Sequence, residues 1–306
     1  MATGYVYDPV YLEHDLRGHP ENQQRLRQIL SVLEKHDTLR RLTQIPAVPI
    51  TRERLERAHE PHYIEQVQRV AQRGGGHLDA DTYVRSASYD AALMAAGGLV
   101  EATRAVLVGE LDNAFALFRP PGLHALRGRG MGFCLFNYVS ISARYALAER
   151  GLDRIFIVDF DVHHGNGTQA VFENSPEVLF VSSHQVPLFP GTGYEGETGC
   201  GNILNMPLAP GDGSRKFRDT WNQHGLPAVH DIAPDLILIS AGFDAHQRDP
   251  LGQIELQDAD YHWITRQICD LATDSCQGRV ASILEGGYDL QALATASRAH
   301  VKALAS

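Results

Sequence analysis

IFIVDFDVHHGNG, residues 155–167, is the stretch of sequence that decides the fold. Its first half is an uninterrupted apolar run, which is typical of a strand buried in a parallel sheet. Asp159, Asp161 and His163 follow at positions i, i+2 and i+4, so their side chains share one face of an extended chain. Buried carboxylates repel each other unless a cation or hydrogen-bond donors satisfy them. We therefore expect a metal site at the end of this strand, although the motif alone could merely cap the following helix.

The composition is that of a globular protein: 306 residues, 43% of them hydrophobic, with a formal net charge of −10. No linker, low-complexity tract or internal repeat divides the chain, so we expect one domain over residues 1–306. The N-terminus lacks the features of a signal peptide, and no apolar stretch reaches the ~18 residues of a membrane span. The four cysteines form no CxxC pair, which favours a reducing, cytoplasmic location. The acidic balance argues against a nucleic-acid partner.

Strands and helices alternate over most of the sequence. Besides residues 155–159, apolar strands are expected at 115–118, 178–184, 235–240 and 280–284. This alternation predicts an α/β fold whose parallel sheet is covered by helices on both faces. In such sheets ligands bind beyond the carboxyl ends of the strands.

Four of these predicted strand ends carry reactive side chains. His124 follows the strand at 115–118, Asp244 follows 235–240, and Tyr288 follows 280–284. Together with Asp161 and His163, Asp244 offers two carboxylates and one imidazole, and this set leaves one coordination position open. Such a set is expected of a catalytic zinc ion, although iron(II), manganese or cobalt would also accept these ligands.

The same residues predict a type of reaction. A divalent cation activates water and polarises a carbonyl oxygen. His124 is placed to take the proton of that water and return it to a leaving amine, and Tyr288 to donate a hydrogen bond to an oxyanion. The residues alone therefore indicate metal-assisted hydrolysis of an amide.

Six motifs resemble those of the zinc-dependent histone deacetylases. They are RPPGLHA (119–125), GFCLFN (132–137), DFDVHHGNGTQ (159–169), FPGTG (189–193), GFDAHQRDPLG (242–252) and EGGY (285–288). The motif HHGNGTQ is most similar to the corresponding motif of the class II enzymes and the bacterial deacetylase-like amidohydrolases. The resemblance implies the arginase-like α/β fold, with one parallel sheet of roughly eight strands.

The resemblance also implies roles for individual residues. One zinc ion per chain would be bound by Asp161, His163 and Asp244. His124, oriented by Asn166, would be the general base and acid, and Tyr288 would stabilise the oxyanion.

Further implied roles concern the substrate and a second ion. An acyl-lysine tunnel would be lined by Gly132, Phe133 and Phe189. Leu251 would lie near its mouth, and Asp81 at its rim. A structural potassium ion would lie near Asp159, Ser182 and Ser183.

Two positions depart from the family pattern. Leu123 stands where the family has the first of two adjacent histidines, which pairs with the position of Asp159, and Tyr138 stands where a second asparagine is usual. We expect Leu123 to shape the pocket floor, and His124 to move protons alone.

Several alternatives remain open for the substrate. Acylated lysine in peptides or proteins is the leading one, because Leu251 lacks the charge that would pair with a polyamine. An acetylpolyamine or another small acylated amine is the second. A third is a zinc-containing acyl-lysine binder whose turnover is impaired by Leu123. An arginase-type ureohydrolase is disfavoured, since Gly165 occupies the place of a further carboxylate. The oligomeric state does not follow from the sequence.

Overall fold

A parallel sheet of eight strands forms the centre of residues 2–306, the part of the chain that the computed structural model describes, apart from the side chains of residues 230 and 231. The order of its strands is β2-β1-β5-β10-β9-β6-β7-β8, and every neighbouring pair is parallel. The predicted α/β fold with a parallel sheet of about eight strands is confirmed. The strands of this sheet are β1 (Thr3–Val6), β2 (Thr43–Ile45), β5 (Asn113–Ala116), β6 (Ile155–Asp159), β7 (Val178–Gln185), β8 (Ile203–Leu208), β9 (Leu236–Ala241) and β10 (Val280–Leu284).

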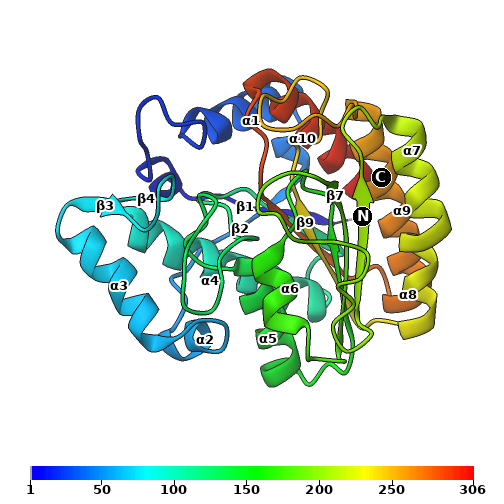
Figure 1. Ribbon diagram of the computed structural model, residues 1–306, viewed down its shortest axis with the longest axis horizontal. Helices are drawn as coiled ribbons and strands as arrows, with labels where there is room; N and C mark the ends of the chain where they lie inside the picture. Colours follow the sequence, from blue (N-terminus) through cyan, green and yellow to red (C-terminus); the bar gives the residue numbers. More distant parts are fainter. Residues whose placement is uncertain (1) are drawn as a thin grey trace.

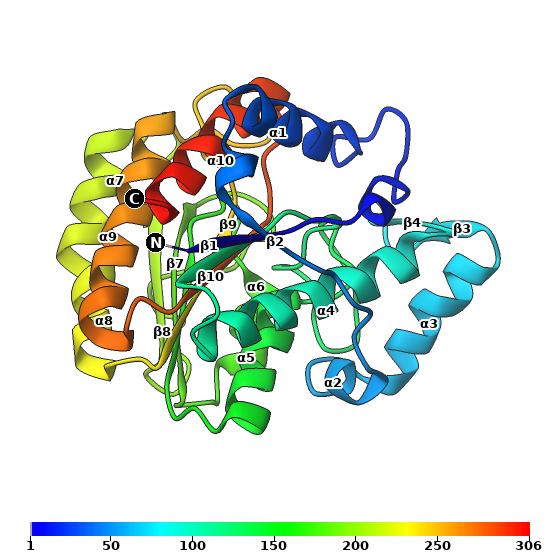
Figure 2. The same cartoon turned by 180° about the vertical axis from the view of Figure 1, so that it is seen from behind.

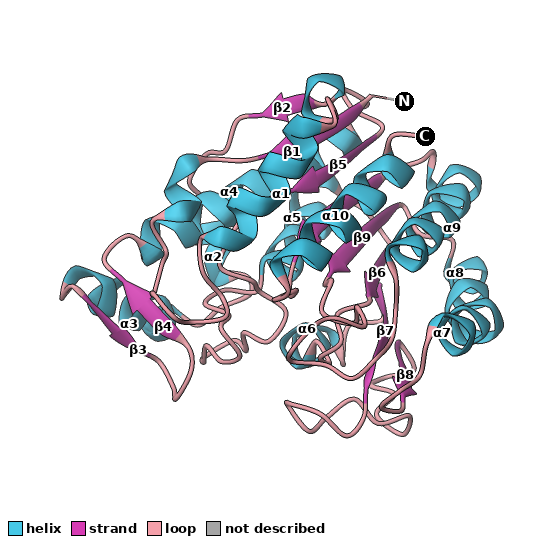
Figure 3. Cartoon of the chain, turned by 90° about the horizontal axis from the view of Figure 1, so that it is seen from above, coloured by secondary structure: helices cyan, strands magenta, loops and turns pink. Residues whose placement is uncertain are grey.

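Helices cover both faces of the sheet (Figures 1 and 2). One face carries α1, α7, α8, α9 and α10, and the other carries α4, α5 and α6. Figure 3 shows the strands side by side, from β2 and β1 at one edge of the sheet to β7 and β8 at the other. The helices are α1 (Gln24–Lys35), α2 (Arg52–Glu56), α3 (Pro61–Gln72), α4 (Ser88–Leu107), α5 (Tyr138–Arg150), α6 (Asn166–Phe172), α7 (Ser214–Thr220), α8 (Leu226–Ile232), α9 (Asp258–Cys276) and α10 (Leu290–Leu304). None of the described helices combines the length and the apolar character that crossing a bilayer requires.

The central strands consist of residues that lie wholly in the core. All residues of β6, β9 and β10 are buried, as their uninterrupted apolar sequences predict. Because β5, β10, β9 and β6 are consecutive in the sheet, the loops that follow them leave from one edge. Residues far apart in the sequence are thereby brought to one place.

The glycine run at 74–76 contains the start of β3 (Gly75–His77), which pairs with β4 (Tyr83–Arg85) in an antiparallel hairpin. This hairpin lies with α2 and α3 at one end of the molecule (Figures 1 and 2). The sequence did not predict the outer strands β2 and β8, since one is short and mostly exposed and the other contains a proline.

Two buried histidines, His59 and His300, are held as neutral rings. Both nitrogens of His300 contact hydroxyl groups, Thr265 Oγ1 at 2.6 Å and Ser282 Oγ at 2.8 Å. His59 Nε2 accepts a hydrogen bond from the backbone N–H of Asn137 at 2.8 Å, and its Nδ1 lies 3.0 Å from the carbonyl oxygen of Leu126. Burial lowers the pKa of His300 to about 3 and that of His59 to about 4.

We expect the free energy of unfolding to fall as the pH drops below about 6.5, the ordinary pKa of histidine, because the unfolded chain then binds protons that the two buried rings do not. At pH 5 each ring should destabilise the fold by ~2 kcal/mol relative to neutral pH. Urea unfolding between pH 7.5 and pH 5 measures this. The variant His300→Gln should show a shallower pH dependence, even if it is less stable at neutral pH. An unchanged pH dependence in this variant would contradict the prediction.

Candidate active site

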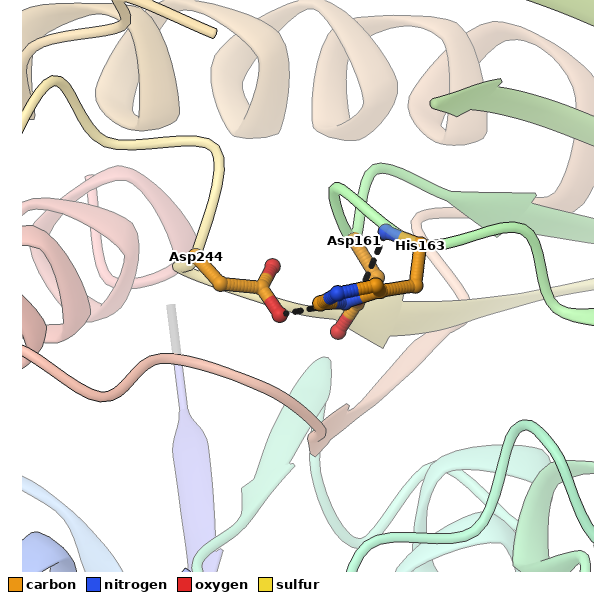
Figure 4. Close-up of side chains that lie close together, drawn as sticks. All are labelled: Asp161, His163 and Asp244. Carbon is orange, nitrogen blue, oxygen red and sulfur yellow. Dashed lines mark hydrogen bonds and ion pairs between the residues drawn. The ribbon is translucent and has the colours of Figure 1, made fainter. Parts of the chain in front are cut away.

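Two loops from adjacent strands carry three side chains, the candidate metal ligands, that point toward one another (Figure 4). Asp161 and His163 follow β6, and Asp244 follows β9. Their ligand atoms all lie within 4.8 Å of one another. His163 Nδ1 lies 3.2 Å from Asp161 Oδ1 and 3.1 Å from Asp244 Oδ2. The structure thus brings together the three residues that the sequence predicts as metal ligands.

Both carboxylates are buried and fixed by the backbone. Asp161 Oδ2 accepts a hydrogen bond from the N–H of Gly286, and Asp244 Oδ1 accepts one from the N–H of Val162, each at 2.8 Å. Burial, together with the charge of Asp161, raises the pKa of Asp244 to about 7. Burial alone would lower the pKa of His163, but the two carboxylates outweigh it and raise that pKa to about 10. The two carboxylates therefore favour a positive charge between them.

Two glycines make room for these carboxylates. A Cβ atom at Gly286 would lie 2.0 Å from Asp244 Oδ2, and one at Gly242 would lie 2.1 Å from Asp161 Oδ2. Any side chain at either position would displace a ligand oxygen. The resulting set of two oxygens and one imidazole nitrogen fits a divalent ion such as zinc.

His124 lies beside this cluster in the loop after β5. Its Nδ1 lies 2.8 Å from Asn166 Oδ1, and the Asn166 amide nitrogen donates to Met131 Sδ at 3.6 Å. Since an amide oxygen only accepts, Nδ1 carries the hydrogen and Nε2 keeps a free lone pair. Burial, with a smaller contribution from His163, lowers the pKa of His124 to about 4. The ring is therefore neutral near pH 7, as a general base must be.

Leu123 is buried against Ala125 and Cys134, with 2% of its surface exposed.

The carboxylate of Glu285 holds the turn before His124, since its Oε2 accepts hydrogen bonds from the N–H groups of Gly122 at 2.7 Å and Leu123 at 3.2 Å. Burial raises the pKa of Glu285 to about 8, and Asp161 adds to this shift. The EGGY motif is recognisable in the sequence, but nothing in the sequence predicts that Glu285 binds the backbone N–H groups of Gly122 and Leu123.

A cavity of about 260 Å³ reaches the candidate metal ligand His163. It is lined by Asp81, His124, Gly132, Phe133, His163, Leu188, Phe189, Leu251 and Tyr288. All of these except Leu188 are residues that the sequence singled out. Leu123 is not in this lining, although the sequence analysis expected it to shape the pocket floor. Its buried position in the loop explains the difference.

Close packing shapes the wall of the cavity. A Cβ atom at Gly132 would lie 2.6 Å from His124 Cδ2 and 2.9 Å from Phe189 Cε1, so only glycine allows both rings to approach. The Phe133 ring meets the Tyr288 ring edge to face, with centroids 5.7 Å apart. Burial raises the pKa of Tyr288 well above its ordinary value, so its hydroxyl stays protonated and can donate a hydrogen bond.

Arg25 supports Tyr288 from outside the cavity, and the sequence analysis missed it. Its guanidinium lies 5.0 Å from the centre of the Tyr288 ring and donates to the carbonyl oxygens of Glu285 and Gly287. It is fully buried and pairs with Glu21 at 3.2 Å. A charged residue in an amphipathic helix normally faces solvent, and Glu21 four residues earlier was the one available signal.

The family model for the histone deacetylase domain matches residues 19–304. A protein of Archaeoglobus fulgidus called probable deacetylase is 37% identical over 298 residues, covering 95% of this chain and 82% of the relative. The histone deacetylase-like amidohydrolase of Pseudomonas aeruginosa is 38% identical over 277 residues, covering 89% and 73%. The crystal structure of the HDA15 HD domain superposes with a TM-score of 0.95 at 35% identity, covering 99% of this chain and 88% of that one.

The fold is an α/β domain with a candidate metal centre, and the relatives named deacetylase and amidohydrolase support a hydrolase. This chain belongs to the histone deacetylase family. The family resemblance stated from the six motifs is thereby confirmed.

Asp161→Ala and Asp244→Ala should each fail to retain a divalent metal, because each removes one of the three candidate ligands and one of the two negative charges that attract a cation. Metal content after dialysis, measured by atomic emission, tests this. Asp219→Asn, at an exposed ion pair with Arg215, is the matched control and should keep its metal. Full metal stoichiometry in either alanine variant would refute the ligand assignment.

Proposed function

We propose that this chain is a zinc-dependent amide hydrolase that removes acetyl or other acyl groups from lysine side chains of peptides or proteins. The observation that carries the proposal is that one cavity is lined by His124, Tyr288 and the metal-ligand candidate His163. A base, an oxyanion donor and a metal position thus surround one space. We further propose that residues 1–306 act as one catalytic domain.

The side chains would divide the reaction as follows. When bound by Asp161, His163 and Asp244, zinc supplies Lewis-acid activation of water and of the amide carbonyl group. His124 accepts a proton from the attacking water at Nε2, and then returns it to the lysine amine as this group leaves. Tyr288 donates a hydrogen bond to the oxygen that becomes negative.

The lining of the cavity favours an acyl-lysine substrate. Phe133 and Phe189 both line it, and their apolar rings would suit the four methylene groups of lysine. Leu251 adds a further apolar group, so it offers no charge for the second amine of a polyamine. Asp81 lines the same cavity, and its carboxylate would accept hydrogen bonds from the backbone N–H groups of a bound peptide.

We also propose a structural potassium ion near Asp159, Ser182 and Ser183. Asp159 is fully buried, and its Oδ2 has no hydrogen-bond partner among the described residues, while Oδ1 accepts from the N–H of Asp161 at 3.0 Å. In the family that this chain resembles, the histidine at the position of Leu123 would pair with Asp159, and leucine has no polar atom that could do so. A monovalent cation bound also by backbone carbonyls at the end of β7 would do so.

The zinc-loaded protein should hydrolyse an acetyl-lysine peptide, and Tyr288→Phe should lower kcat by roughly 10²- to 10³-fold, the loss that follows removal of one oxyanion donor. Steady-state kinetics on a fluorogenic peptide measure this, with equal zinc content in both proteins as the control. Wild-type activity in Tyr288→Phe would contradict the proposed role of the tyrosine.

Comparing the turnover of the unaltered chain with that of Leu123→His distinguishes an enzyme from a protein that binds acyl-lysine without hydrolysing it. If the unaltered chain turns over its substrate, His124 alone moves the protons. If only Leu123→His is active, while the unaltered chain binds an acetylated peptide without forming product, the hydrolase proposal for this chain fails. Faster hydrolysis of acetylpolyamines than of acetyl-lysine peptides, assayed side by side, would contradict the proposed substrate class.

A further inference from the structure

Asp249 lies in the loop after β9, five residues beyond Asp244, and 8% of its surface is exposed. Both of its carboxylate oxygens accept hydrogen bonds from backbone N–H groups. Oδ2 accepts from Tyr288 at 2.6 Å and from Asp289 at 3.3 Å, while Oδ1 accepts from Leu251 at 3.0 Å. Tyr288 and Leu251 both line the cavity. One carboxylate therefore connects two parts of the cavity wall that come from different strand loops.

Among the described residues, Asp249 forms no ion pair that would explain its burial. The adjacent Arg248 extends to Asp289, with nitrogen and oxygen 3.1 Å apart. Removing a carboxylate from water is unfavourable, and here three N–H groups offset that loss. The hydrogen bonds of Asp249 therefore fix the backbone of the two loops that contain Leu251 and Tyr288.

The turn that carries Tyr288 depends on such contacts. Gly286 and Gly287 precede the tyrosine and have no side chains to pack, and Gly287 has a φ of +124° that other residues rarely adopt. The N–H of Gly286 is held by Asp161, and the carbonyl oxygen of Gly287 by Arg25. Asp249 is the group that holds the N–H of Tyr288 itself.

We infer that Asp249 is a positioning residue, whose carboxylate sets the place of the Tyr288 hydroxyl relative to the metal ligands and to the wall at Leu251. This inference rests on the proposed function, in which Tyr288 stabilises the oxyanion. Displacement of a catalytic group by about 1 Å can lower a rate by about 10²-fold. The hydrogen bonds of Asp249 therefore bear directly on turnover.

Asp249→Asn tests the inference, because asparagine keeps the shape of the side chain but presents one oxygen and one NH₂ group to donors on both sides. We expect kcat to fall by roughly 10- to 100-fold with KM changed less than about threefold, since Tyr288 acts mainly in the transition state. The zinc content should not change. Arg248→Ala, which removes the neighbouring contact to Asp289, is the matched control and should keep at least half of the wild-type kcat.

A double-mutant cycle separates positioning from a general loss of stability. Asp249→Asn introduced into Tyr288→Phe should lower kcat less than about twofold further, because the hydroxyl that Asp249 positions is already absent. The inference is overturned if Asp249→Asn retains wild-type kcat, or if it lowers kcat by the same factor in both backgrounds. If Asp249→Asn does not fold, Asp249→Glu replaces it in the same cycle, since it keeps the charge but moves the oxygens by one methylene group.

Amide hydrogen exchange tests the hydrogen bond between Asp249 and the Tyr288 N–H without an activity assay. The segments 249–252 and 286–289 should exchange faster in Asp249→Asn than in the wild type, and Arg248→Ala should leave the Tyr288 amide protected. A wild-type protein that turns over no acylated amine overturns the proposed function, and exchange still tests the contact on its own. Unchanged exchange at Tyr288 in Asp249→Asn overturns the inference even in an active enzyme.

Discussion

The mutual repulsion of two buried carboxylates, Asp161 and Asp244, is the constraint on which the rest of the structure depends. Neither is exposed to solvent by more than 1%, and His163 lies within hydrogen-bonding distance of both. Such a pair is stable only with positive charge and hydrogen-bond donors around it. The chain provides donors from the backbone and space from Gly242 and Gly286. The electrostatic environment that suits a cation is thus built into the loops themselves.

The same chemistry recurs around the cavity. Glu285 holds the backbone before His124, and Asp249 holds the backbone of Tyr288. Loops rich in glycine and proline have little apolar surface with which to fix themselves. Buried acceptors that bind N–H groups supply that rigidity, and each one satisfies backbone donors that burial would otherwise leave unpaired. Preorganised groups of this kind are what catalysis by transition-state stabilisation requires.

Leu123 replaces a polar neighbour of the proposed base His124 with an apolar side chain, and this side chain does not line the cavity. Its side chain is buried with Ala125 and Cys134, so the base region keeps one imidazole, His124, whose partner is the neutral amide of Asn166. A neutral partner orients the ring but does not raise its pKa as a carboxylate would. Elsewhere in the site, Asp159 Oδ2 is buried and has no hydrogen-bond partner among the described residues.

The sequence by itself determined the strand–helix alternation, the parallel sheet and the edge at which Asp161, His163, Asp244, His124 and Tyr288 meet. These follow from uninterrupted apolar runs and from polar residues at their ends, which are local signals. The sequence did not predict the edge strands β2 and β8 or the hairpin β3–β4. Short or partly exposed strands have a weak pattern of apolar residues, and they form only when a neighbouring strand pairs with them. Tertiary structure alone decided that Leu123 is buried, that the Arg25 guanidinium lies against the Tyr288 ring, and that Asp249 and Glu285 accept hydrogen bonds from the backbone of the loops that line the cavity. Each of these is a contact between segments distant in the chain, and its direction depends on backbone geometry that residue order does not specify.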